Sequence, residues 1–98
     1  MKIRTSPSVA DKILHGHGVT SDEIHECFLN RDGPPFEDTR LGNRTDDPPT
    51  YWFIAFTDRE RRLKIVYMDY PDRIQIKTAY PPNEREIALY NDLCLGLK

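Results

Sequence analysis

Three strand-like segments follow one another between two pairs of prolines, and this stretch constrains the fold more than any other part of the chain. A proline cannot donate a backbone hydrogen bond within a sheet, so the pairs at 48–49 and 81–82 mark places where strands stop. Aromatic and β-branched residues are frequent in the segments between them, which are residues 51–57, 63–68 and 74–80. Because short polar turns join the segments, we expect an antiparallel sheet.

The last segment alternates with the period of two that is typical of a strand with two different faces. One face is expected to carry Ile74, Ile76, Thr78 and Tyr80, and the other Gln75, Lys77 and Ala79. Thr78 and Tyr80 therefore share a face. Lys77 and Thr78 point to opposite faces unless a β-bulge intervenes.

Helix-capping signals stand on both sides of this stretch. Ser6 and Pro7 open a first helix, which the glycines at 16 and 18 end. The capping box Thr20–Glu23 opens a second helix, with Val19 and Ile24 spaced as a hydrophobic staple. Asn83 and Glu86 form a similar pair at the start of a last helix, 83–95.

Together these elements predict one α+β domain over residues 1–98. It would contain two N-terminal helices, an antiparallel sheet of three to four strands, an exposed loop at 41–50 and the C-terminal helix. The fourth strand would be the short segment Phe36–Arg40. We expect the helices to pack on one face of the sheet.

Composition excludes several classes of protein. No apolar run approaches the roughly 20 residues that cross a bilayer, and the N-terminus lacks the apolar stretch of a secretory signal. The two cysteines, Cys27 and Cys94, fit free thiols in a cytoplasmic protein, and no paired Cys or His spacing supports a metal site. The net charge of −2 excludes coating of nucleic acid through bulk charge, but residues 59–77 carry six cations against three acids.

The order of several short motifs resembles the BrnT-type members of the RelE/ParE-like toxins, within the wider barnase/colicin/RelE-like group. The matching segments are His17–Thr20 with Asp22–Glu23, Phe28, Asp38–Arg40, Arg61–Tyr67, and Arg73–Ala79 followed by Arg85–Glu86. Such toxins are small bacterial ribonucleases that a cognate antitoxin neutralises. The resemblance implies a RelE-like fold, a cytoplasmic toxin–antitoxin system, RNA as substrate and a small antitoxin protein as partner.

A metal-independent ribonuclease needs a base for the 2′-hydroxyl, an acid for the 5′-oxygen and cations for the phosphorane, and it requires no cofactor. Histidine exchanges protons near neutral pH, so His17 is the candidate base or acid. Tyr80 can donate a proton or stack on a nucleobase. Lys77 and Thr78 complete the candidate catalytic set. The candidate phosphate ligands are Arg40, Arg61, Arg62 and Arg73.

The alternative function is a non-catalytic module that retains the toxin fold and binds a small helical protein. Two features favour it. The net charge of −2 is low for a protein that binds RNA, and Tyr80 stands where the BrnT pattern usually has an arginine.

Overall fold

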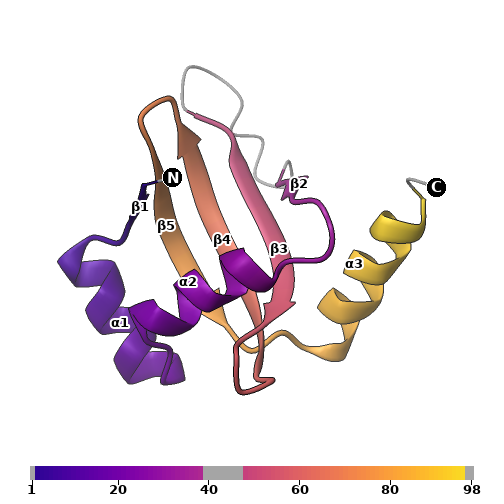
Figure 1. Cartoon of the computed structure of the whole chain (residues 1–98), viewed down its shortest axis with the longest axis horizontal. Helices are drawn as coiled ribbons and strands as arrows, with labels where there is room; N and C mark the ends of the chain where they lie inside the picture. The colour runs from indigo at the N-terminus through magenta and orange to yellow at the C-terminus, as the bar shows by residue number, and fades with distance from the viewer. Residues whose placement is uncertain (1, 39–47, 97–98) are drawn as a thin grey trace.

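The three strands expected between the proline pairs form the centre of the sheet in the computed structural model, which describes residues 2–38 and 48–96 (Figure 1). In chain order the elements of these residues are β1 (Ile3–Arg4), α1 (Pro7–His17), α2 (Ser21–Asn30), β2 (Phe36–Glu37), β3 (Thr50–Phe56), β4 (Arg62–Tyr70), β5 (Arg73–Tyr80) and α3 (Glu84–Leu95). The α+β class and the order of the predicted helices are confirmed. Arg40 and most of the expected loop, residues 41–47, lie outside the described residues.

The described strands form one sheet of five in the order β1-β5-β4-β3-β2. Neighbours from β5 to β2 are antiparallel, but β1 pairs with β5 in parallel, with Ile3 opposite Ile74. The prediction of three to four purely antiparallel strands is therefore wrong in number and in type. A two-residue strand carries no alternation that a sequence pattern can detect, and its pairing partner lies some seventy positions away.

The capping signals place the helix ends. Thr20 and Glu23 form both hydrogen bonds of the capping box, and so do Asn83 and Glu86. Helix α1 ends at His17, between the two glycines that were expected to end it. Its C-cap is Gly18, whose φ of 63° is the left-handed conformation that glycine adopts without steric cost.

The helices cover both faces of the sheet, so the expectation that all pack on one face is wrong. Phe28 of α2 stacks edge-on against Phe53 of β3, with ring centroids 4.9 Å apart. Tyr90 of α3 instead lies 5.5 Å from the ring of Trp52. Because adjacent strand residues point to opposite faces, α2 and α3 pack on opposite sides. Figure 1 shows α2 crossing in front of the sheet and α3 beside β3.

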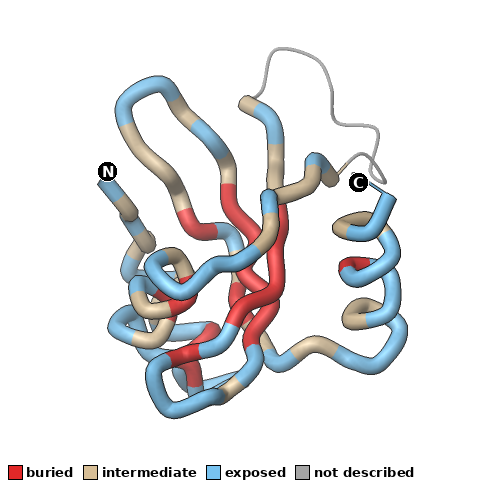
Figure 2. Tube along the Cα trace, turned by 45° about the vertical axis from the view of Figure 1, so that its right-hand side comes forward, coloured by how far each residue is buried: buried red, intermediate tan, exposed pale blue. Residues whose placement is uncertain are grey.

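The core lies mainly between the sheet and the pair α1 and α2. Phe53, Leu63 and Ile65 of the central strands are fully buried there, as is Ile24 of α2. Burial of each such side chain contributes about 1.5–3 kcal/mol to folding. Figure 2 shows the buried residues concentrated on the central strands and the helices over them, whereas the tip of the β4–β5 hairpin is exposed or half-buried.

A shift of register in β5 decides which side chains reach the other face. Tyr67 pairs with Ile76 but Val66 pairs with Thr78, so Lys77 is an inserted residue without a partner in β4. Tyr67 faces α2, with its ring 5.4 Å from that of Phe28, and Ile76 therefore faces the same core.

The expected alternation of β5 is thus wrong after Ile76. Tyr80 pairs with Lys64, and both lie on the face opposite α1 and α2 together with Thr78. The bulge also removes the conflict between Lys77 and Thr78, because neighbours on either side of an inserted residue no longer alternate strictly. We call this side of the sheet the open face.

Candidate functional site

Four polar side chains from four different elements meet at one end of the open face. They are His17 at the end of α1, Lys64 in β4, Tyr80 in β5 and Glu86 in the first turn of α3. The rings of His17 and Tyr80 lie 5.6 Å apart. The Tyr80 hydroxyl donates a hydrogen bond to Glu86 Oε2 at 2.7 Å, and Lys64 Nζ donates to the same oxygen at 2.8 Å. We call these residues the polar cluster.

Glu86 joins the cluster because the capping box of α3 fixes it. Its Oε1 accepts the backbone N–H of Asn83 at 3.0 Å, which leaves Oε2 free to receive Lys64 and Tyr80. Burial by itself raises the pKa of Glu86, but the hydrogen bonds from Lys64, the Asn83 backbone and Tyr80 outweigh it and hold the pKa below its ordinary value. Glu86 is therefore a carboxylate at neutral pH.

Lys64 is a buried cation, with only 3% of its side chain exposed. Its ammonium lies 4.7 Å from the centroid of the Trp52 ring and 5.7 Å from that of Tyr80, so aromatic faces and Glu86 replace the water it has lost. A hollow of about 240 Å³ opens beside it, lined by Glu37, Asp38, Trp52, Lys64, Glu86, Leu89 and Leu93. A buried, paired lysine next to such a hollow is typical of functional sites as well as of structural ion pairs.

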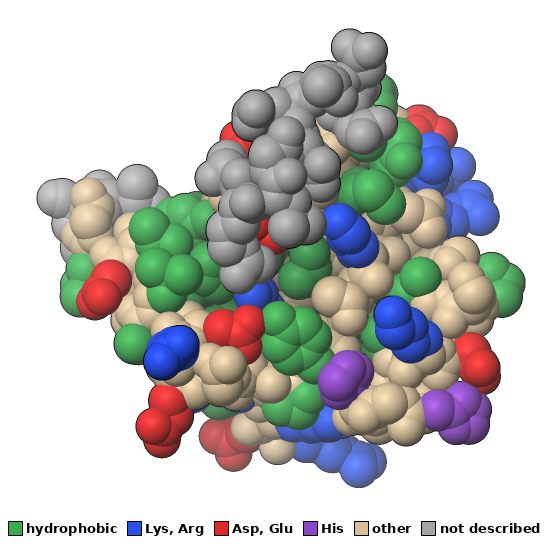
Figure 3. Space-filling model, turned by 180° about the vertical axis from the view of Figure 1, so that it is seen from behind, with side chains coloured by type: hydrophobic (Ala, Val, Ile, Leu, Met, Phe, Trp, Pro, Cys, Tyr) green, Lys and Arg blue, Asp and Glu red, His purple; other side chains and the backbone are tan. Residues whose placement is uncertain are grey.

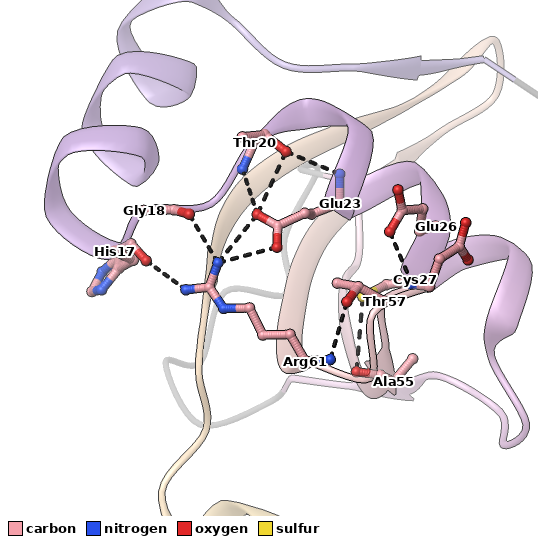
Figure 4. Close-up of polar contacts among 10 residues, drawn as sticks. His17, Gly18, Thr20, Glu23, Glu26, Cys27, Ala55, Thr57 and Arg61 are labelled. Atoms are coloured by element: carbon pink, nitrogen blue, oxygen red, sulfur yellow. Dashed lines mark hydrogen bonds and ion pairs between the residues drawn. The ribbon is translucent and has the colours of Figure 1, made fainter.

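Arg61 holds His17 in place through the backbone (Figure 4). Its guanidinium donates to the carbonyl oxygen of His17 at 2.7 Å and to that of Gly18 at 2.8 Å, which would otherwise lack partners at the helix end. The same group forms an ion pair with Glu23 at 3.1 Å. Burial raises the pKa of Glu23, but hydrogen bonds from Thr20 and Arg61 lower it to a value below the ordinary one.

The four predicted catalytic residues lie on or beside this end of the sheet. His17 and Tyr80 are in ring contact, and the imidazole is exposed to solvent. Thr78 is half-buried two residues before Tyr80 on the same face, and Lys77 is exposed on the bulge. The structure thus brings the predicted imidazole and phenol together.

The predicted phosphate ligands are not gathered around them. Arg61 is engaged in the contacts described above. Arg62 lies on the open face, but its guanidinium covers the ring of Phe56 at 4.8 Å. Arg73 stands at the opposite end of β5 from Tyr80, and Arg40 lies outside the described residues.

Sequence reasoning missed the pair of Lys64 and Glu86 as members of the site. One signal was available, because a lone lysine between Leu63 and Ile65 falls on the face opposite two core residues. The second signal was ambiguous, since helix capping accounts for Glu86 without any other role.

No family model matches the chain, and no curated protein matches it significantly. Within residues 2–38 and 48–96, no group of three or more His, Cys, Asp or Glu side chains is arranged to hold a metal ion. None of the helices in the same residues has the length and apolar character needed to cross a membrane.

Proposed function

We propose that this protein is a metal-independent endoribonuclease of the RelE/BrnT-like toxin type, which acts on RNA in the cytoplasm and is neutralised by a cognate antitoxin. The contact between the His17 and Tyr80 rings on the open face carries the proposal. An imidazole and a phenol can both transfer protons, and their ring centroids lie 5.6 Å apart. Such a pair suits a reaction that removes a proton from the 2′-hydroxyl and delivers one to the 5′-oxygen. The order of the motifs along the chain supports the RelE-like assignment of the fold.

In the proposed reaction His17 removes the proton of the 2′-hydroxyl, and the 2′-oxygen attacks the adjacent phosphorus. The bond from phosphorus to the 5′-oxygen then breaks, and the leaving oxygen takes the proton of the Tyr80 phenol. The products are a 2′,3′-cyclic phosphate and a 5′-hydroxyl, and solvent restores both protonation states.

The rest of the polar cluster positions the phenol. In the structure the single O–H of Tyr80 is donated to Glu86 Oε2 at 2.7 Å, so in the proposed reaction it turns from Glu86 to the leaving oxygen. The Lys64 ammonium, 5.7 Å from the Tyr80 ring, offsets the repulsion between the phenolate and the Glu86 carboxylate. In this proposal Thr78 and Lys77, along the same strand, contact the phosphate.

The test is RNA cleavage in the presence of a chelator. His17→Ala should reduce the rate by about 10²–10⁴-fold, the usual contribution of a general acid or base. His15→Ala is the matched control, because His15 lies two residues earlier on α1, is exposed and pairs with Asp11. Wild-type protein that leaves RNA intact, or a His17→Ala variant as active as the wild type, would refute the reaction.

Tyr80 and Lys77 are tested in the same assay. Tyr80→Phe keeps the ring and removes the proton, so it should lower the rate without loss of stacking, and Tyr70→Phe on β4 is its control. Lys77→Ala should raise KM more than it lowers kcat if the ammonium binds phosphate.

One observation favours the second candidate, a non-catalytic module that binds a small helical protein. The strongest charges of the polar cluster neutralise each other, because Lys64 and Glu86 form an ion pair. Expression in a bacterial host separates the two functions. The toxin slows growth unless a partner from an adjacent reading frame is co-expressed, whereas the binding module is tolerated alone.

A further inference from the structure

The far end of the open face carries a second concentration of positive charge. Strand β1 places Arg4 beside Gln75 in β5. Ile3 and Ile74, one position earlier in each strand, pack against the core, so Arg4 and Gln75 point to the open face. A hollow of about 340 Å³ lies here, and its lining includes Lys2, Arg4, Asp72, Arg73 and Gln75.

Three cations and one carboxylate line this hollow. Arg73 is held in place, because its guanidinium covers the ring of Tyr70 at 4.0 Å, pairs with Asp72 at 3.0 Å and donates to Gln75 Oε1 at 3.1 Å. Lys2 and Arg4 are exposed and form no ion pair within the described part of the chain. Two positive charges are therefore available to a ligand, beside a third of fixed orientation.

Lys77 connects this hollow to the polar cluster. It is exposed on the bulge, between Arg73 at the start of β5 and Tyr80 at its end. The seven steps from Arg73 to Tyr80 span about 23 Å along the strand at ~3.3 Å per residue. Figure 3 looks at the open face and shows Lys and Arg side chains from its upper right edge toward an exposed histidine. We call Lys2, Arg4, Arg73 and Lys77 the basic strip.

From this placement we infer that the basic strip binds the phosphates of a single-stranded RNA and leads it to His17 and Tyr80; the inference rests on the proposed function and names its substrate. Lys2 lies level with Arg73 on the neighbouring strand, Arg4 follows beside Gln75, and Lys77 comes two residues later in β5. An A-form RNA duplex presents two backbones, whereas this narrow strip of cations fits the backbone of one strand. In a protein of net charge −2, this local charge supplies the attraction that the whole molecule lacks.

The test measures binding separately from cleavage. The protein is the His17→Ala variant, and the probe is a fluorescent single-stranded RNA of twelve nucleotides, followed by anisotropy in chelator at several salt concentrations. Four phosphate contacts predict a slope of log K against log salt of about −2.8, since each contributes about −0.7 for a single strand. Adding Lys2→Gln and Arg4→Gln to the His17→Ala variant should make the slope shallower, about −1.4, because two phosphate contacts remain. Binding in low salt should weaken at least about tenfold.

Matched controls distinguish the strip from general charge. Lys12→Gln with Arg59→Gln removes two exposed cations that lie outside the strip, and should leave the slope unchanged. Substitution of Arg4 could disturb β1, whereas Lys2 lies outside that strand. Lys2→Gln alone should therefore give the intermediate slope of about −2.1 without that effect. An RNA duplex should bind more weakly than the single strand.

Three results would overturn the inference: no binding of the RNA, an equal loss in the Lys12 and Arg59 control, or an unchanged slope after substitution of Lys2 and Arg4. Because the probe is bound and not cut, an inactive wild-type enzyme would refute the proposed function without altering this result. In a cleaving enzyme, the Lys2 and Arg4 substitutions should lower kcat/KM for the twelve-nucleotide RNA and leave that for a dinucleotide unchanged.

Discussion

Replacement of Glu86 by glutamine tests the polar cluster most sharply as a structural unit. Glutamine keeps an oxygen that accepts the Asn83 N–H, so the cap of α3 is retained. It removes the negative charge that pairs with the Lys64 ammonium, whose side chain is only 3% exposed. Loss of one partner of a buried ion pair costs about 3–5 kcal/mol. Glu86 is 19% exposed, so we expect the lower end of that range, about 3 kcal/mol.

The assay is urea unfolding followed by the fluorescence of Trp52, the single tryptophan of the chain, whose ring lies under Lys64. A loss of about 3 kcal/mol lowers Tm by about 12–24 °C in a domain of this size. The double variant Lys64→Met with Glu86→Gln should recover much of the loss, because it removes the unpaired charge. A loss below about 1 kcal/mol, or additive single effects, would refute the reasoning.

The pH dependence of stability follows from the same pair. The pKa of Glu86 is lower in the folded protein than its ordinary value, so its contribution is fully present above about pH 4.3 and is lost as the pH falls through the folded-state pKa. The wild type should therefore lose stability on acidification below about pH 4.3, more steeply than Glu86→Gln. Parallel curves for the two proteins would contradict this origin of the shift.

Three further predictions concern the surroundings of the cluster. Gly18→Ala forces a side chain into the left-handed conformation at the end of α1 and should cost about 1 kcal/mol in urea unfolding; an unchanged midpoint would contradict this. Burial raises the pKa of the Cys27 thiol to about 12, whereas Cys94 is half-buried, so a thiol reagent should modify one cysteine in the native protein and both in denaturant. Modification of native Cys27 would refute the prediction. Arg61→Met removes donors from two carbonyl groups and an acid and should cost about 1–3 kcal/mol, while Arg59→Met, at an exposed position, should cost less than about 0.5. Equal losses would contradict the role of Arg61.

Local signals in the sequence predicted the local structure well. Both capping boxes, at Thr20 and Asn83, occur as expected, because the residues that form them lie three positions apart. The central strands were likewise marked by composition and by their proline boundaries.

Features that depend on distant partners were not predictable in the same way. Strand β1 exists only because β5 is beside it. The bulge at Lys77 depends on the register between β5 and β4. A prediction from strict alternation along β5 assumes that no residue is inserted and therefore misses it. Which face of the sheet α3 covers depends on the path of the chain after the proline pair at 81–82, and no local pattern gives that path. Patterns within a short window contain none of this information.

The candidate site shows the same division. The chemistry of single side chains identified His17 and Tyr80, and the structure places them in contact. The pair formed by Lys64 and Glu86 spans 22 positions and required coordinates. Arg61 was predicted as a phosphate ligand from its charge alone, yet its donors face backbone oxygens and Glu23.

The most direct test of the proposed reaction is the chemical identity of the RNA ends formed in the presence of a chelator. Attack by the 2′-oxygen predicts a 2′,3′-cyclic phosphate and a 5′-hydroxyl, identified by mass spectrometry. It also predicts that an RNA with deoxyribose at the cleavage position remains intact. Ends that carry a 5′-phosphate and a 3′-hydroxyl, or cutting of the deoxy-substituted RNA, would contradict the account.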